Sequence, residues 1–203
     1  MVRTKDPVVR SLLLARAAQM LRTRQPVTLR ALVAGTGVST MAVYTYFGGM
    51  DGLWKALRQE GFTRLAAQLA AVKMSADPVR DLSALGAAYL ANAMENPDLY
   101  RVMFDTGFDL EDTNAADETL HQLVRAIDRA KANGRFHGEV DPLELATQSW
   151  LIGHGLASLV ATGPLPPQTL AHGVPMLTAL FTSAGDEPDL CRRSVEHGWA
   201  GAG

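Results

Sequence analysis

The sequence predicts an all-α protein, in which an N-terminal three-helix bundle with a helix-turn-helix is followed by a larger helical domain. Apolar residues recur at helical spacing along most of the 203 residues, whereas the alternating pattern of a half-buried strand is nearly absent. An aspartate followed by proline, a typical helix start, occurs at Asp6, Asp77 and Asp141. The apolar fraction of 47% and the charged fraction of 20% are those of an ordinary globular protein.

The first fifty residues carry signals for three helices. Asp6-Pro7 places an N-cap before a proline at the first helical position, and Pro26 ends this helix. Thr28 can cap a short second helix, which Gly35-Thr36-Gly37 interrupts. Ser39 can cap a third helix, which ends at a pair of glycines.

Longer helices follow, separated by proline, glycine and asparagine. An acidic loop over residues 105–117 divides them, and residues 186–203 have the composition of a short helix with a frayed tail. We expect the longer helices at residues 51–71, 78–96, 99–104, 118–132, 142–162 and 167–183.

Charge is distributed unevenly along the chain. Residues 1–60 contain nine Lys and Arg against three Asp and Glu (+6), whereas residues 61–203 contain ten against eighteen (−8). A basic N-terminal part followed by an acidic remainder indicates that the N-terminal part binds a polyanion. Chance segregation of surface charge is the alternative.

The predicted third helix carries three aromatic residues, Tyr44, Tyr46 and Phe47, on a segment with almost no charge. Two short helices joined by a turn at Gly37 form a helix-turn-helix. Phe47 and Tyr46 suit the core beside Val43, which leaves Tyr44 to face outward. An exposed tyrosine suits DNA, because its ring can pack on sugar edges and its hydroxyl can donate to a phosphate. The alternative is that all three rings are buried.

Other residues of this segment also suit a DNA-binding helix. Ser39 and Thr40 lie at the helix N-terminus, whose free amides attract phosphate. Met41, Ala42 and Thr45 are short enough to let the helix enter the major groove, where apolar contacts recognise thymine methyl groups. We therefore predict that all five contact DNA.

The segment Thr28–Leu57, "TLRALVAGTGVSTMAVYTYFGGMDGLWKAL", resembles the DNA-binding domain of the TetR family of transcriptional regulators. Where that family usually has a lysine that contacts phosphate, this chain has Met50, and Arg3, Lys5 and Arg30 can compensate. The resemblance implies that the DNA contacts are Thr28, Ser39, Thr40, Ala42, Tyr44 and Thr45.

Two motifs in the second half resemble the same family. "NPDLYRVMF" (Asn96–Phe104) and "WLIGHGLASL" (Trp150–Leu159) are similar to its subgroup with a Trp-x-x-x-His-Gly signature, the WHG-type C-terminal domain. The resemblance implies a homodimer held by a four-helix bundle, and a repressor that a small-molecule effector releases from a double-stranded DNA operator. It divides the chain into a helix-turn-helix DNA-binding domain over residues 1–50, an effector-binding and dimerisation domain over 51–185 and a C-terminal tail over 186–203.

Residues 145–185 contain no Asp, Glu, Lys or Arg. A membrane hairpin is disfavoured, because Gln148, His154 and several prolines interrupt the run. Two alternatives remain, a pair of helices buried within one chain and a pair buried against a second copy. Gly153 and Gly155 would let another helix approach closely, which favours a dimer interface.

Candidates for the effector pocket are large apolar side chains with a few polar tips, which suit a mostly apolar ligand. They are Tyr89, Met94, Tyr100, Met103, Phe104, Trp150 and His154. Trp150 and His154 lie four residues apart and so share one helix face. Each of these residues also suits a buried core position, where His154 would make an internal hydrogen bond.

We expect neither an enzyme nor a metal or cofactor site. The five histidines show no ligand spacing, and the chain has no Gly-rich phosphate loop or nucleophile elbow. The single cysteine, Cys191, excludes an intramolecular disulfide and, with the missing secretion signal, predicts a cytoplasmic location. The alternative to a ligand-responsive repressor is a constitutive DNA-binding protein without an effector.

Overall fold

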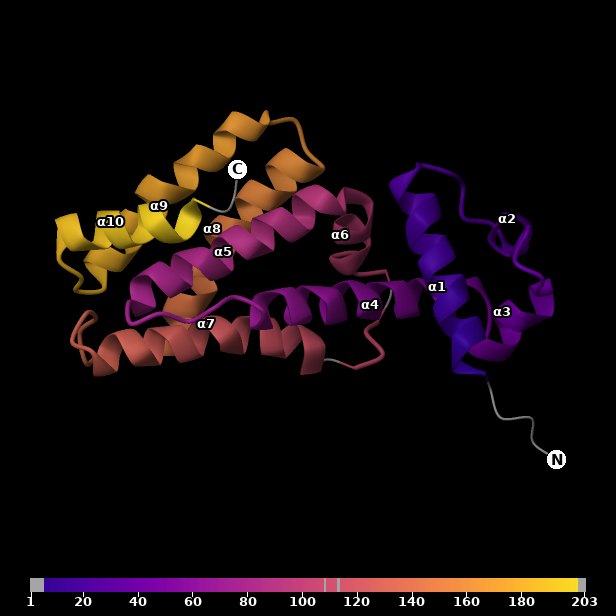
Figure 1. The fold of residues 1–203 in the computed structure, drawn as a ribbon, viewed down its shortest axis with the longest axis horizontal. Coiled ribbons are helices and arrows are strands. Elements are labelled where there is room, and N and C mark those ends of the chain that lie inside the picture. Colours follow the sequence, from indigo (N-terminus) through magenta and orange to yellow (C-terminus); the bar gives the residue numbers. More distant parts are fainter. Residues whose placement is uncertain (1–5, 108, 113, 201–203) are drawn as a thin grey trace. The chain divides into compact units, whose positions relative to one another are not determined.

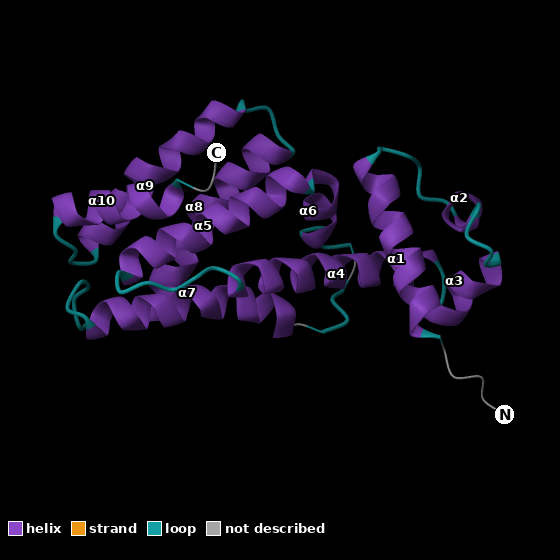
Figure 2. Ribbon diagram, viewed as in Figure 1, coloured by secondary structure: helices purple, strands orange, loops and turns teal. Residues whose placement is uncertain are grey.

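The computed structural model describes residues 6–107, 109–112 and 114–200, and every regular element in these residues is a helix (Figures 1 and 2). The prediction of an all-α fold is confirmed. In chain order the elements are α1 (Pro7–Arg22), α2 (Leu29–Val33), α3 (Thr40–Phe47), α4 (Met50–Ala70), α5 (Pro78–Glu95), α6 (Pro97–Met103), α7 (Asn114–Ala132), α8 (Pro142–Ala161), the 3-10 helix η1 (Pro167–His172), α9 (Gly173–Ser183) and α10 (Pro188–Trp199).

The helices form two compact units. The first consists of Met1–Phe62 and Asn96–Thr113, and the second of Thr63–Glu95 and Asn114–Gly203. The domain boundary expected after the third helix differs from this division, because α4 is divided between the units and α6 returns to the first. The physical reason is that Leu99 of α6 packs in the same apolar core as α1, a contact that no local pattern reveals.

Apolar packing holds the first unit together. α1 begins as predicted, because the carboxylate of Asp6 accepts a hydrogen bond from the backbone N–H of Val8 at 2.9 Å. Thr28 caps α2 in the same way and accepts from the N–H of Ala31 at 3.3 Å. Burial of each large apolar side chain here contributes roughly 1.5–3 kcal/mol to the free energy of unfolding. The buried core contains Leu13, Leu14, Ala17, Met20, Leu32, Val43, Leu53, Ala56, Leu57 and Leu99.

α5 is the central helix of the second unit and packs against α7, α8 and α10 (Figure 1). α10 approaches α5 closely because Gly198 has no side chain: a Cβ there would clash with the carbonyl oxygen of Arg80. In the same contact the hydroxyl of Ser83 donates to the carbonyl oxygen of Val195 at 2.8 Å. α5 therefore organises the other helices of this unit.

The prediction of one continuous helix over residues 167–183 is wrong at its start. Pro167–His172 form η1, and α9 begins only at Gly173. Pro175 explains the break, because a proline in a helix interior lacks the N–H and clashes with the preceding turn, whereas the first turn tolerates it. The start at Gly173 places Pro175 in that first turn.

The short helix expected within residues 186–203 is present as α10. α10 runs from Pro188 to Trp199, and its Cys191, Val195 and Trp199 are buried. The carboxylate of Glu187 caps its N-terminus. The few apolar residues of α10 lie among charged ones, so the composition alone did not show that this helix is packed against the rest of the unit. Residues 201–203 lie outside the described residues.

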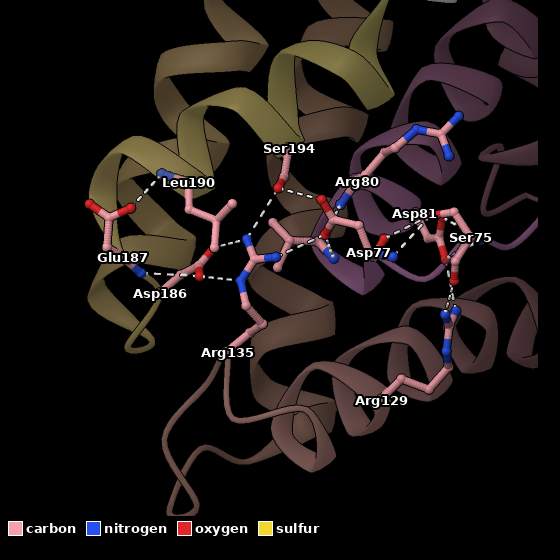
Figure 3. Close-up of polar contacts among 11 residues, drawn as sticks. Ser75, Asp77, Arg80, Asp81, Arg129, Arg135, Asp186, Glu187, Leu190 and Ser194 are labelled. Carbon is pink, nitrogen blue, oxygen red and sulfur yellow. Dashed lines mark hydrogen bonds and ion pairs between the residues drawn. The ribbon is translucent and has the colours of Figure 1, made fainter.

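A polar network joins three segments of the second unit (Figure 3). α7 ends in a Schellman turn, in which Gly134 has a φ of 71° and the N–H of Arg135 donates to the carbonyl oxygen of Ala130 at 2.9 Å. The guanidinium of Arg135 then contacts Asp186 before α10 (Nε to Oδ1, 2.5 Å) and Asp77 before α5 (Nη1 to Oδ1, 3.0 Å).

The network continues along α5. The hydroxyl of Ser194 donates to the carboxylate of Asp77 at 2.5 Å, and Arg129 of α7 contacts the buried Asp81 at 2.9 Å. Burial raises the pKa of Asp77, but hydrogen bonds from Ser194 and the backbone and the charge of Arg135 outweigh it, so this pKa lies below its ordinary value of 3.8. Asp77 is therefore an anion at neutral pH.

Arg135→Met should lower the free energy of unfolding by about 3–5 kcal/mol, because the buried carboxylate of Asp186 loses its cation. Urea titration followed by circular dichroism measures the loss. Arg192→Met is the matched control: its contacts with Asp189 and Glu196 are exposed, so the expected loss is about 0–1 kcal/mol. Equal losses in the two variants would contradict a structural role for the network.

Candidate functional site

The first unit contains a helix-turn-helix made by α2 and α3. Gly37 lies in the turn with a φ of 74°, as the sequence predicts. Leu32 of α2 and Val43 of α3 are fully buried in the core that α1 shares. The guanidinium carbon of Arg10 lies 5.6 Å from the centroid of the Phe47 ring, in a cation–π contact. These contacts hold α3 by one face and leave the opposite face at the surface.

The three aromatic residues of α3 have three different environments. Tyr44 is 50% exposed, and among the described residues nothing hydrogen-bonds its hydroxyl. Its ring lies beside Gly49, where an added Cβ would be 3.7 Å from Cε1. Tyr46 is half-buried and its hydroxyl accepts a hydrogen bond from the N–H of Asp6 at 3.0 Å, while Phe47 packs against the core. The alternative in which all three rings are buried is therefore wrong.

The other predicted DNA contacts divide into exposed and half-buried residues. The exposed ones are Thr28, Arg30, Ser39, Met41 and Thr45, and the half-buried ones are Thr40 and Ala42. The hydroxyl of Thr45 donates to the carbonyl oxygen of Met41 at 2.9 Å, which leaves the methyl group of Thr45 for contact with a partner. Ser39 occupies the N-cap position of α3, but its side chain makes no capping hydrogen bond.

The position of the family's usual lysine has a structural role here. Met50 is the first residue of α4, is half-buried and packs against the core of the first unit. Of the cations expected to compensate, Arg30 is exposed on α2, whereas Arg3 and Lys5 lie outside the described residues. Arg30 is thus the compensating cation whose surroundings the structure describes.

The second unit contains a narrow cavity of about 30 Å³, which is room for one or two water molecules. Its lining residues come from α4, α5, α7, α8, α9 and α10, and none of them is charged. They are Leu69, Leu82, Leu85, Gly86, Tyr89, Thr119, Leu123, Ser149, Trp150, Gly153, Leu177, Phe181 and Trp199. An apolar wall with a few polar tips suits a mostly apolar ligand.

Three of the predicted ligand residues come together at this cavity. Tyr89 and Trp150 line it, and His154 contacts both. The hydroxyl of Tyr89 lies 2.9 Å from Nδ1 of His154, and the imidazole stacks on the ring of Trp150 with centroids 5.0 Å apart. Burial lowers the pKa of His154 below its ordinary value of 6.5, so the imidazole is neutral at pH 7.

The remaining predicted ligand residues lie elsewhere. Met94 lines a separate open groove beside Trp199. Tyr100, Met103 and Phe104 belong to the first unit, where the rings of Tyr100 and Phe104 are 5.0 Å apart and Met103 is buried. The structure thus brings three of the seven residues together, and the assignment of the other four to a ligand site stays a prediction.

Sequence reasoning missed most of the cavity wall. Leu69, Leu123 and Phe181 are ordinary apolar positions of α4, α7 and α9, and no local signal marks them as cavity residues. Trp199 was assigned to the short helix and tail of residues 186–203 and not to a ligand site, although a lone tryptophan in a polar segment is itself a signal of burial.

Residues 82–182 match the family described as tetracyclin repressor-like, C-terminal domain. A solved protein of unknown function from Rhodococcus sp. RHA1 is 26% identical, with a TM-score of 0.68 over 91% of this chain and 94% of that one. CprB, a TetR family protein from S. coelicolor A3(2), is 18% identical, with a TM-score of 0.67 over 96% of this chain and 98% of that one. The chain has the fold of the TetR-family regulators.

RolR, solved in complex with resorcinol, has the same fold at 15% identity, with a TM-score of 0.65 over 93% of each chain. None of the curated proteins matches this chain in sequence.

TetR-family regulators are generally not enzymes. In the described part of the chain, no group of three or more His, Cys, Asp or Glu side chains is placed to hold a metal ion. Each described helix is too short or too polar to span a lipid bilayer.

His154→Gln should flatten the dependence of stability on pH between about pH 7.5 and 5.5. Because the pKa of His154 is lowered in the folded state, the unfolded chain binds more protons below about pH 6.5, and the wild-type protein loses stability there. Thermal unfolding measured at a series of pH values tests this. The carboxylate of Asp77 acts in a lower window, below about pH 4, because its pKa is also lowered.

The exposed His172 supplies the control. His172→Gln should keep the wild-type slope of melting temperature against pH. If His154→Gln keeps that slope as well, the imidazole of His154 takes up its proton equally in the folded and unfolded states, and burial in the cavity wall does not keep it neutral.

Proposed function

We propose that this protein is a DNA-binding transcriptional repressor that acts as a homodimer and is released from its operator by a small, mostly apolar molecule. The observation that carries the proposal is the outer face of α3, on which Met41 and Tyr44 are 65% and 50% exposed in an otherwise packed helix-turn-helix. Large exposed apolar side chains on so short a helix indicate a binding surface. The TetR-type fold supports the same function. A regulator of this kind works on DNA, so we place it in the cytoplasm.

The proposed contacts fall into two groups. Tyr44 donates to a phosphate, and the other backbone contacts are assigned to Thr28, Arg30, Ser39 and Thr40. Contacts to bases in the major groove are assigned to Met41, Ala42 and Thr45. The methyl groups of these side chains favour thymine, because its C5-methyl group is an apolar feature of the major groove. Operator half-sites should therefore contain thymine opposite α3.

The proposed dimer interface lies on α8 and α9. Leu151, Gly155 and Leu159 follow one another at intervals of four residues and share a face of α8, where both leucines are exposed. Met176 of α9 is exposed as well. An apolar, uncharged surface on two neighbouring helices favours burial against a second copy.

The proposed effector site is the cavity beside Trp150 and His154. Trp150, His154 and Gly155 have the spacing of the WHG signature, to which we assign this C-terminal domain. RolR, which shares the fold, was solved with resorcinol, a small aromatic molecule. The second candidate function is a constitutive DNA-binding protein, and the small volume of the cavity, about 30 Å³, favours it.

Selection of bound sequences from random duplex DNA tests the function. We expect a pseudo-palindrome whose half-sites lie about one helical turn (~34 Å) apart or a multiple of that. A thermal-shift screen of small aromatic molecules, repeated with the selected DNA present, separates the two candidate functions. Recovery of no preferred sequence would sink the proposal of a specific regulator.

Tyr44→Phe should weaken binding to the selected operator by about 10- to 100-fold, because a hydrogen bond to a charged group contributes roughly 1.5–3 kcal/mol. Fluorescence anisotropy with labelled duplex measures the change. Tyr46→Phe is the matched control: it removes the acceptor of the Asp6 N–H within the protein, so operator affinity should stay unchanged. Equal affinity for wild type and Tyr44→Phe would place the hydroxyl away from phosphate.

Leu151→Glu should dissociate the dimer, because burying an unpaired carboxylate costs several kcal/mol. Analytical ultracentrifugation should show a dissociation constant raised by about 100-fold or more. Leu190→Glu, on the exposed face of α10, is the control and should leave the dimer intact. A dimer that tolerates Leu151→Glu would move the interface off this face of α8.

A further inference from the structure

The indole ring of Trp199 occupies a slot that two glycines keep open. A Cβ on Gly173 would clash with ring atoms Cζ2 and Cη2, and a Cβ on Gly86 would lie 3.2 Å from Cζ3. The indole N–H donates to the carbonyl oxygen of Leu170 at 3.2 Å. We call this space, between Gly86 of α5 and Gly173 of α9 with the Leu170 carbonyl at one edge, the Trp199 slot.

Trp199 also lines two spaces. One is the narrow cavity of about 30 Å³, which it lines together with Tyr89 and Trp150. The other is an open groove of about 520 Å³, which it lines together with Met94 and Leu170. Ligand sites in proteins typically measure about 300–1,000 Å³, so the groove has the volume of such a site and the cavity does not. Trp199 is the residue that the two linings have in common.

The backbone that carries Trp199 is firmly held. Arg135 binds Asp186 just before α10 and Ser194 within it, and the hydroxyl of Ser83 donates to the carbonyl oxygen of Val195 one turn before Trp199. Gly198 is in close contact with α5. Displacement of the indole would therefore require rotation about its own side-chain bonds and not a movement of α10.

We propose that Trp199 is a displaceable plug, and that the Trp199 slot binds a flat aromatic molecule with an N–H or O–H donor. The ligand enters from the groove, takes the place of the indole and donates to the carbonyl oxygen of Leu170. The displaced ring moves into the groove, and the slot then becomes continuous with the cavity at Tyr89. The inference rests on the proposed effector response, and it names the chemical class of the effector and the residue that admits it.

The chemistry of the slot supports this class of ligand. The space between two glycine backbones accepts a planar ring and excludes a branched aliphatic group of the same volume. The lining of the adjoining cavity has no charged side chain to pair with an ionic ligand. The carbonyl oxygen of Leu170 accepts from the backbone N–H of Gly173 and has a second lone pair, which the indole N–H uses and which a ligand N–H or O–H can use in its place. The protein's own indole meets all three conditions.

Indole itself is the probe for the experiment. In Trp199→Ala the slot is vacant, so isothermal titration should show that indole binds one site at least about 10-fold more tightly than it binds wild type. In wild type the tethered ring competes at an effective concentration on the order of millimolar or above. Benzofuran has the same shape without the donor and should bind Trp199→Ala more weakly, by up to about tenfold.

Two controls locate the binding. Trp54→Ala removes a tryptophan from the first unit and should leave indole binding at the wild-type level. Gly86→Ala in the Trp199→Ala background narrows the slot and should abolish the gain. If Trp199→Ala does not fold by circular dichroism, Trp199→Leu keeps apolar volume and should bind indole more tightly than wild type. A folded variant with no gain in indole affinity overturns the proposal.

This experiment tests the role of Trp199 as a plug independently of the proposed function as a DNA-binding repressor. Indole binding is measured without DNA, so a vacant slot that takes up indole supports the plug whether or not operator DNA is recognised. Suppose that Trp199→Ala binds indole, but that neither wild type nor Trp199→Ala is released from DNA by any aromatic molecule. The Trp199 slot is then a binding site, and the proposed effector response is wrong. If DNA release occurs in wild type and Trp199→Ala gains no indole affinity, the effector binds elsewhere.

Discussion

The second unit depends on one cation, Arg135, that three separate segments share. Asp77 precedes α5, Asp186 precedes α10 and Arg135 follows α7, so the loss of Arg135 removes the shared cation from both carboxylates. The desolvation of buried charges offsets much of their attraction, and such a network stabilises only the arrangement in which every partner is in place. We interpret it as a device that specifies how α5, α7 and α10 pack (Figure 3).

The position of α10 in turn determines the candidate effector site. Gly198 brings α10 against α5, and this contact places Trp199 between Gly86 and Gly173. α10 lies outside residues 82–182, the segment that matches the family. The residue that closes the cavity is thus supplied by a part of the chain with no counterpart in that match. A charged network at one end of α10 and an apolar plug at the other give the helix two separate roles.

In the first unit, structural and binding roles are divided within one short helix. Val43 and Phe47 hold α3 in the core, and Tyr46 binds the start of α1. Tyr44 and Met41 take no part in that packing and remain exposed. This division was predictable from sequence, because the residues that hold α3 and those that face outward alternate within eight positions of one helix. The helix N-caps at Asp6 and Thr28 were predictable for the same reason.

The sequence by itself determined the helical class, the helix-turn-helix and its exposed face, because caps, turns and amphipathic spacing act over a few residues. Only the tertiary structure decided which distant segments meet. It placed α6 with Tyr100 and Phe104 in the first unit, placed Tyr89 and Trp150 in the second, and packed the helix of residues 188–199 against α5. Apolar side chains at helical spacing are equally suited to any apolar surface, so their partners are set by the packing of the whole unit. Trp199 is the clearest case, since its slot is built by two glycines and a carbonyl group from elements far away in the chain.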